Sequence, residues 1–221
     1  MAAQYDIITF DCYGTLVDWR GGIVRAFEQA GVVSPGVTPE GILALHAEIE
    51  PVVQGERYRP YRDVLRITAQ RMIEKMGGQV PPDGGDFLPK SVPTWPPFPD
   101  TNTALTRMRS AGVELGILSN IDDELLEQTL RQIDVDFTLV VTAQQVGAYK
   151  PNHAHFHAAR DRIGDRRWLH AAQSYFHDIV PAHELGIPSA WVNRLAEAPS
   201  GEARARTEVP DLTGLADRIV A

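Results

Sequence analysis

The sequence predicts an α/β fold, in which a doubly wound parallel sheet carries an all-helical unit inserted after its first strand. Three observations lead to this prediction. Ile7–Phe10 is a β-branched and aromatic run typical of a buried strand, the stretch after it keeps helical apolar spacing, and from residue 100 strand-like runs alternate with helical ones. Strands that alternate with helices imply parallel βαβ units. We therefore assign residues 1–16 and 93–221 to the α/β core and residues 17–92 to the helical unit.

Size, charge and cysteine content narrow the class of protein. The 221 residues suit one large domain, or a core with a smaller inserted one. The net charge of −8 opposes binding to nucleic acid or to anionic membranes. Cys12 is the only cysteine, so we expect a buried thiol, no intrachain disulfide and no cysteine-based metal site. The sequence contains no secretory signal and no apolar run of about 18 residues, and we expect a cytoplasmic protein.

The helical unit is expected to contain three helices and a long return linker. Residues 21–30 form a short helix that a glycine closes, and Thr38 is a plausible N-cap with a proline at the first helical position. An apolar stripe over residues 61–76 predicts a longer helix that stops at a Gly-Gly pair. Residues 79–99 are rich in Pro and Gly and are interpreted as an irregular linker back to the core.

The core elements follow in regular alternation. Polar residues 196–208 are interpreted as a surface loop before a closing helix. The expected strands are 113–118, 137–142, 168–172 and 189–192, and the expected helices are 101–111, 122–132, 151–163, 181–185 and 212–220, with Asp122 as the N-cap of the second of these helices.

Asp11 stands directly after the first strand, where open α/β sheets place their chemistry. A carboxylate can act as a nucleophile and form a covalent ester or acyl phosphate. The plainer alternative is a strand that ends in a helix N-cap. Gly14 is expected in a conformation that suits a sharp turn, and Thr15 with the nearby amides is expected to hold the carboxylate.

Polar residues also follow the later strands. Ser119 and Asn120 end one strand, Lys150 stands between a strand and a helix, and Asp178 follows the next strand. Alternatives are an Asx-type cap for the serine–asparagine pair and a solvated surface charge for the lysine. Two neighbouring carboxylates raise the pKa of one of them, and an ammonium group between Asp11 and Asp178 would keep both ionised.

The order Asp-x-x-Gly-Thr, Ser-Asn, Lys-Pro and a late Asp resembles the haloacid dehalogenase superfamily over nearly the whole chain. FDCYGTLVDW is most similar to the type II L-2-haloacid dehalogenases. The resemblance implies a Rossmann-like core with residues 17–92 as a cap domain. It also implies that Asp11 displaces halide from a small 2-haloacid to form an ester, and that water activated by Asp178 then releases a 2-hydroxy acid. Lys150 would stabilise both carboxylates.

The resemblance also suggests the substrate-binding residues. Thr15, Ser119 and Asn120 match family positions that hold the substrate, and Tyr13 and Ser174 stand beside the motifs. In the family an arginine early in the cap binds the substrate carboxylate, but none stands near Leu45–His46. The candidates nearby are Arg20, Arg57, Arg59 and Arg62, and we take Arg59 from the basic segment ERYRPYRD, whose alternative interpretation is a solvated helix start.

Some positions depart from the family pattern. Gln173 and Tyr175 replace a serine and an asparagine of the fourth motif, and Phe156 replaces a tyrosine. Phosphatases of the superfamily keep acids at the positions of Tyr13 and Gln173, one to protonate the leaving group and one to bind Mg²⁺. A halide is a weak base that leaves without a proton, so the sequence predicts a hydrolase with no metal and no cofactor. The histidines lack metal-ligand spacing and are interpreted as incidental.

Two alternatives remain open from the sequence. One is a phosphatase or phosphonate hydrolase that binds Mg²⁺ through Asp11 and Asp178. The other is a non-catalytic protein that keeps the fold and binds a ligand or partner. The sequence also leaves a homodimer possible.

Overall fold

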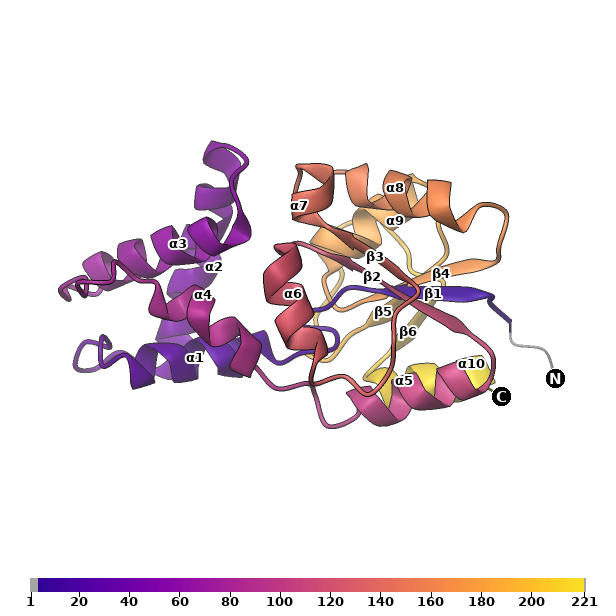
Figure 1. Cartoon of the computed structure of the whole chain (residues 1–221), viewed down its shortest axis with the longest axis horizontal. Coiled ribbons are helices and arrows are strands. Elements are labelled where there is room, and N and C mark those ends of the chain that lie inside the picture. The colour runs from indigo at the N-terminus through magenta and orange to yellow at the C-terminus, as the bar shows by residue number, and fades with distance from the viewer. Residues whose placement is uncertain (1–3, 221) are drawn as a thin grey trace.

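The computed structural model describes residues 4–220 and contains one six-stranded sheet in which every neighbouring pair of strands is parallel (Figure 1). The spatial order is β3-β2-β1-β4-β5-β6. The strands are β1 (Ile7–Phe10), β2 (Glu114–Ser119), β3 (Leu139–Thr142), β4 (Trp168–Ala172), β5 (Ser189–Val192) and β6 (Thr207–Val209). This arrangement confirms the predicted doubly wound parallel sheet.

Helices cover both faces of the sheet. Figure 1 shows α5 and α10 beneath it and α7, α8 and α9 above it. The core helices are α5 (Thr101–Ser110), α6 (Asp123–Leu130), α7 (Ala143–Val146), α8 (Ala154–Ile163), α9 (Val180–Glu184) and α10 (Leu212–Val220). Because both faces are covered, all four residues of β1 are fully buried, and Cys12 beside them is a buried free thiol, as expected.

The strand order reverses at β1. From β1 the chain builds outward through β2 to β3 on one side, and then through β4 to β6 on the other. The crossover connections diverge at such a switch point and leave a crevice at the carboxyl ends of the strands, where α/β proteins bind ligands. Asp11 follows β1, Ser119 ends β2 and Asp178 follows β4, so three candidate site residues come from the strands that frame this crevice.

The helices that precede α5 in the segment after β1 form a group beside the sheet, at the left of Figure 1. They are α1 (Trp19–Gln29), α2 (Pro39–Glu56), α3 (Tyr61–Lys75), α4 (Phe87–Ser91) and the 3₁₀ turn η1 (Val92–Thr94). Thr38 caps α2 as predicted, since its Oγ1 accepts the Gly41 amide at 3.2 Å. Phe27 and Phe87 pack edge to face with centroids 5.1 Å apart, joining α1 to α4.

Two adjacent chain segments connect this group to the sheet. Val17 and Pro97 form an antiparallel bridge. The Asp18 amide donates to Pro96 O and the Phe98 amide donates to Leu16 O, both at 2.9 Å. The segment that leaves the sheet for the helical group and the segment that returns from it therefore run side by side. The domain division at residues 16–17 and 92–93 remains a prediction.

Two segments expected to be irregular contain structure. Residues 79–99 include α4 and η1, because Leu88 and Val92 are fully buried against the other helices. Residues 196–208 run into β6, which pairs with β5 from Thr207↔Ala190 onward. The first prediction was wrong for residues 87–94 and the second only for residues 207–208, where tertiary packing outweighs the polar or proline-rich local composition.

Some element boundaries also differ from the expected ones. β3 begins at Leu139 and α8 begins at Ala154, each later than predicted. Asp122 stands at the N-cap position of α6 but makes no capping hydrogen bond to it. Its carboxylate instead accepts the amides of Tyr61 and Arg62, at 2.7 and 2.9 Å, so it caps α3 from across the crevice.

Candidate active site

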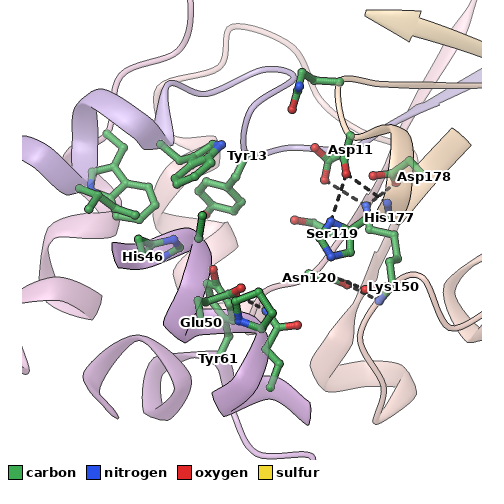
Figure 2. A pocket seen from close by; sticks show the side chains of 18 residues that line it. Asp11, Tyr13, His46, Glu50, Tyr61, Ser119, Asn120, Lys150, His177 and Asp178 are labelled. Atoms are coloured by element: carbon green, nitrogen blue, oxygen red, sulfur yellow. Dashed lines mark hydrogen bonds and ion pairs between the residues drawn. The ribbon is translucent and has the colours of Figure 1, made fainter. Parts of the chain in front are cut away.

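A buried ammonium group lies between two carboxylates at the carboxyl end of the sheet (Figure 2). Lys150 Nζ donates to Asp11 Oδ1 at 3.0 Å, to Asp178 Oδ1 at 2.6 Å and to Leu118 O at 2.8 Å. These three bonds use its three protons. Only 1 % of Lys150 is exposed, which excludes the solvated surface charge. The two carboxylates meet around Lys150 as the sequence predicts.

The turn after β1 fixes the second oxygen of Asp11. Thr15 Oγ1 donates to Asp11 Oδ2 at 2.9 Å and accepts the Gln173 amide at 2.9 Å. Gly14 has φ +101°, and a Cβ there would lie 3.0 Å from Trp19 Nε1. The left-handed conformation and this close approach both require glycine. Thr15 therefore orients the carboxylate from behind and does not line the cavity.

Asn120 holds the backbone that carries the lysine. Its Oδ1 accepts the Lys150 amide at 2.7 Å, and its Nδ2 donates to Lys150 O at 3.0 Å. The side chain therefore joins the end of β2 to the loop after α7 and makes no Asx-type cap. These two hydrogen bonds fix the position from which Lys150 reaches the two carboxylates.

Behind Asp178 lies a buried hydrogen-bond chain that sequence reasoning missed. Trp168 Nε1 donates to Thr9 Oγ1 at 2.8 Å, Thr9 Oγ1 lies 2.9 Å from His170 Nδ1, and His170 Nε2 lies 3.0 Å from Asp178 Oδ1. Indole is only a donor, so the threonine hydroxyl accepts from it. The ionised Asp178 can only accept, so Nε2 carries a proton and donates to it, and the threonine hydroxyl donates to Nδ1.

His170 was interpreted as incidental, and this was wrong. Its position on a buried strand gave no signal in the sequence, because a histidine inside a strand has no motif spacing. In the structure it is fully buried between Phe156 and Asp178, and its tautomer is fixed by the chain of donors. His46 and His177, also interpreted as incidental, line the cavity.

The charges of the site follow from burial and from Lys150. Burial raises the pKa of Asp11 above its ordinary value, while Lys150 and Thr15 oppose the rise. Burial alone would also raise the pKa of Asp178, but Lys150 and His170 outweigh it and hold that pKa well below its usual range. Burial would lower the pKa of Lys150, and the two carboxylates raise it instead. Asp178 and Lys150 are therefore charged at neutral pH.

A cavity of about 350 Å³ opens over these groups, between the sheet and the helical group. It lies within the size range of small-molecule sites. Core and helical residues both line it: Asp11, Tyr13, Ser119, Asn120, Lys150, Gln173, Ser174, His177 and Asp178 from the core side, and Trp19, Ile23, His46, Ala47, Glu50, Pro51, Gln54, Tyr61 and Trp95 from the other.

Two of the proposed substrate-binding hydroxyls already have partners. Tyr13 OH lies 2.8 Å from Thr129 Oγ1, which itself donates to Leu125 O, so the tyrosine is the donor. Ser174 Oγ accepts the His177 amide at 3.1 Å and caps the π-helical turn η2 (Tyr175–Ile179) that carries Asp178. Both residues line the cavity, and their roles toward substrate remain predictions.

Arg59 lies outside the cavity. Its guanidinium pairs with Glu56 at 3.0 Å, and its backbone carbonyl accepts Tyr149 OH at 2.7 Å. Among the described residues that line the cavity there is no arginine. The structure therefore gives no support to Arg59 as the residue that binds the substrate carboxylate, and that role stays a prediction.

Three buried side-chain atoms of the cavity residues have no hydrogen-bond partner within the protein. They are His46 Nε2, Ser119 Oγ and Asp178 Oδ2. Buried polar groups are nearly always bonded, so unpartnered atoms in a cavity mark the places where a bound molecule completes the site. Asp178 Oδ2 is the free oxygen of a carboxylate whose other oxygen accepts two bonds.

The positions that hold acids in superfamily phosphatases serve other purposes here. Tyr13 bonds to Thr129, and Gln173 Nε2 donates to Glu197 at 3.2 Å. Residues 4–220 contain no group of three or more His, Cys, Asp or Glu arranged to hold a metal ion. Within the same residues, no helix is long and apolar enough to cross a membrane.

A family model for haloacid dehalogenase-like hydrolases matches residues 5–172, which is most of the chain. The chain belongs to the haloacid dehalogenase-like hydrolase family. The match includes Asp11, Ser119 and Lys150, and it ends before the π-helical turn that carries Asp178. The family resemblance stated from the sequence motifs is thereby confirmed.

Individual relatives agree with this assignment. (S)-2-Haloacid dehalogenase H-109 of Pseudomonas putida is 28 % identical over 222 aligned positions, covering 92 % of this chain and 96 % of the relative. (S)-2-Haloacid dehalogenase 4A of Burkholderia cepacia is 25 % identical, covering 87 % and 85 %. The L-2-haloacid dehalogenase of Xanthobacter autotrophicus with chloropropionic acid covalently bound shares the fold, with a TM-score of 0.82, 20 % identity and coverage of 97 % and 98 %.

Proposed function

We propose that the protein is a metal-independent hydrolase that displaces halide from a small 2-haloacid through an ester on Asp11 and yields a 2-hydroxy acid. The observation that carries the proposal is the Lys150 ammonium, buried between Asp11 and Asp178 within hydrogen-bond distance of both. The ammonium opposes the rise that burial causes in the pKa of Asp11 and so favours an ionised nucleophile, and the described residues contain no cluster of metal ligands.

In the first step an oxygen of Asp11 attacks the carbon that carries the halogen. The carbon–oxygen bond forms as the carbon–halogen bond breaks, and the halide leaves with the bonding electrons. Because a halide is a weak base, no proton donor is required, which fits a tyrosine that donates to Thr129 at position 13. Lys150 and Thr15 hold the two oxygens of Asp11 in one orientation.

In the second step water attacks the ester carbonyl carbon of Asp11. Asp178 Oδ2 is free to take the proton, since Lys150 and His170 both bond to the other oxygen. The Asp178 proton then passes to the departing alkoxide, and Asp11, which keeps the second water proton as a carboxylic acid, releases it and becomes a carboxylate again. Lys150 remains close to the oxygens of Asp11 and stabilises the negative charge that develops there.

The experiment that tests this mechanism is single turnover of the Asp178→Asn variant with 2-chloropropionate. We expect about one halide per active site and a stalled adduct on the peptide that contains Asp11, detected by mass spectrometry. In ¹⁸O-labelled water, the unaltered protein should first release product with an unlabelled oxygen from Asp11. Labelled product on the first turnover with no adduct would mean that Asp11 acts as a base, and the proposal would be wrong.

A metal titration separates the proposal from the Mg²⁺-dependent alternatives. Halide release should survive exhaustive chelation and gain nothing from added Mg²⁺. Phosphate release that disappears with EDTA and returns with Mg²⁺ would favour a phosphatase or phosphonate hydrolase. Release of neither product, with retained ligand binding, would favour the non-catalytic alternative.

We also propose that the protein is cytoplasmic and acts without nucleic-acid or membrane partners, in keeping with its net charge of −8. A homodimer remains possible. Light scattering of the purified protein would give the oligomeric state, and a monomer at all concentrations tested would exclude the dimer.

A further inference from the structure

The wall of the cavity opposite Asp11 is polar and comes from the helical group. His46, Glu50 and Gln54 lie one turn apart along α2, so they share one face of that helix. Figure 2 shows His46 and Glu50 beside Tyr61, across the cavity from Ser119 and Lys150. When the reacting carbon of a substrate reaches Asp11, the other groups of the substrate lie near this wall.

This wall offers no positive charge to an anionic substrate. Among the described lining residues, Lys150 is the only lysine or arginine, and its three protons are already bonded to two carboxylates and a carbonyl. The nearby Arg59 and Arg62 pair with Glu56 and Glu124 outside the cavity. A substrate carboxylate therefore meets no free cation here.

Two features of the wall point to a ligand. His46 lines the cavity and is 5 % exposed, and its buried Nε2 has no hydrogen-bond partner, although leaving a buried imidazole nitrogen unbonded is costly. Its ring is held against Trp19, with centroids 5.3 Å apart. Glu50 lies one turn further along, held by hydrogen bonds from Gln54 and Tyr61.

We propose that His46 and Glu50 bind the carboxyl end of the substrate as an uncharged pair, with Glu50 in its carboxylic acid form donating a hydrogen bond to a substrate oxygen. The assignment of that end as a carboxyl group rests on the proposed function. In the complex, the carboxyl group of Glu50 and that of the substrate share one proton, and His46 Nε2 bonds to the second substrate oxygen. A charge-assisted hydrogen bond of this kind replaces the ion pair that an arginine would supply.

The titration of the surrounding groups agrees with this pairing. Burial raises the pKa of Glu50 to about 7, against the hydrogen bonds from Gln54 and Tyr61 that lower it. Burial lowers the pKa of His46 to about 4, so its ring is neutral throughout. Tyr61 and Tyr149, which face Glu50 from α3 and from the loop after α7, have pKa values raised by burial and keep their protons.

Across the cavity, Asp178 and Lys150 have pKa values moved away from neutrality. Burial raises the pKa of Asp11, and Lys150 opposes this rise. Burial lowers the pKa of His177, so His177 titrates on the acid side of its ordinary value. Because the pKa of Asp11 is raised as well, the Glu50→Gln variant is what assigns a proton-linked change between about pH 7 and about pH 8.5 to Glu50.

The proposal predicts opposite behaviour for an acid and its amide. A carboxylate needs the proton of Glu50, so it binds more weakly as Glu50 ionises. A neutral amide of the same shape loses nothing, because its N–H donates to the ionised Glu50 instead. Propionate and propionamide are suitable probes, since they carry no halogen and bind without reaction.

The experiment measures both dissociation constants by calorimetry on the unaltered full chain, between about pH 6 and about pH 8.5, in two buffers of different ionisation enthalpy. Propionate should bind about tenfold more weakly for each pH unit above about 7, with uptake of nearly one proton at about pH 8. Propionamide should bind with no such loss. Propionate affinity that does not change over this range would overturn the proposal.

Variants assign the effect to particular side chains. Glu50→Gln keeps the shape and offers an N–H at every pH, so the propionate affinity should become independent of pH. Glu48→Gln, on an exposed position of the same helix that pairs with Lys75, is the matched control and should keep the pH dependence. His46→Phe keeps the packing on Trp19 and should weaken propionate about tenfold without moving the midpoint. A pH dependence that persists in Glu50→Gln would also overturn the proposal.

This test is independent of catalysis. If no 2-haloacid releases halide while propionate binds with proton uptake, the proposed function fails and the recognition pair stands. If halide is released through an Asp11 adduct while propionate affinity ignores pH, the pair is wrong and the proposed function stands.

Discussion

The two walls of the cavity use polar groups in opposite ways. On the sheet side, Asp178 and Lys150 are charged at neutral pH, and hydrogen bonds hold Asp11 and Asp178 to Lys150. On the helical side, His46 and Glu50 are both neutral between about pH 4 and about pH 7. The comparison indicates that the sheet side is organised for one reaction, whereas the helical side selects what reaches it.

Removal of the central charge should have the largest effect. Lys150→Met leaves Asp11 and Asp178 facing each other in a buried site, so activity should be lost and the free energy of unfolding should fall by about 3 to 5 kcal/mol at neutral pH. Without the ammonium the folded-state pKa values of both carboxyls rise, so the folded protein binds more protons and the deficit shrinks as pH falls.

Urea unfolding at about pH 5 and about pH 8 measures this change. Lys75→Met is a matched control, because it breaks the exposed pair with Glu48 and should cost about 1 kcal/mol or less at both pH values. Equal losses for the two variants would mean that the sheet side does not depend on its buried charge.

The helical side should respond to pH in its stability. The pKa of Glu50 is about 7 in the folded protein against an ordinary 4.5, so stability is full below about pH 4.5 and falls as pH rises to about 7. Glu50→Gln removes this fall, so relative to the unaltered protein it should gain about 2 to 3 kcal/mol between about pH 4.5 and about pH 8. Denaturant unfolding across this range is the measurement. A difference in the free energy of unfolding that stays constant with pH would contradict a protonated Glu50 in the folded protein.

The donor chain behind Asp178 should affect only the second chemical step. Thr9→Val keeps the shape but removes the hydroxyl that fixes the His170 tautomer. We expect kcat and KM to fall together by about tenfold with kcat/KM unchanged, and the ester on Asp11 to accumulate while the halide burst keeps its rate. Rapid-quench kinetics separates the two steps. A slower burst with no accumulated ester would mean that His170 has only a structural role. Ser189→Ala removes another buried hydroxyl and serves as a control.

The smallest expected effect concerns the link between the two walls. Asp122→Ala removes the carboxylate that caps α3 from the sheet side and should cost about 1 kcal/mol of stability. Because α3 carries Tyr61, which holds Glu50, the KM for 2-haloacids should rise while kcat changes little. Steady-state kinetics decides this, and a lower kcat at constant KM would place the effect of Asp122 on the sheet side instead.

The sequence predicted the sheet side far better than the helical side. Asp11, Ser119, Lys150 and Asp178 follow strands, and the carboxyl ends of parallel strands converge at a switch point, so strand assignment alone brings them together. His170 was missed because its partner Thr9 lies on the neighbouring strand, and only the parallel register aligns the two. β6 was missed because a short polar edge strand has no apolar signal.

The helical side could not be predicted in the same way. Which face of α2 meets the cavity depends on how the helical group sits on the sheet, and one helix gives no information about that. Arg59 was chosen for its charge, but the turn of the chain before α3 directs it to Glu56. His46 and Glu50 have helical spacing, yet the same spacing occurs in many solvated helix faces.

The paired crossing at Val17 and Pro97 makes the protein modular. The inserted segment leaves and re-enters the α/β core at neighbouring residues, where Leu16 and Phe98 are already hydrogen-bonded. A segment with its ends together can be exchanged for one of different length without changing the register of any strand. Natural variation and protein engineering can therefore rebuild the cavity wall that the helical group forms, including its charge, while the reacting carboxylates keep their positions.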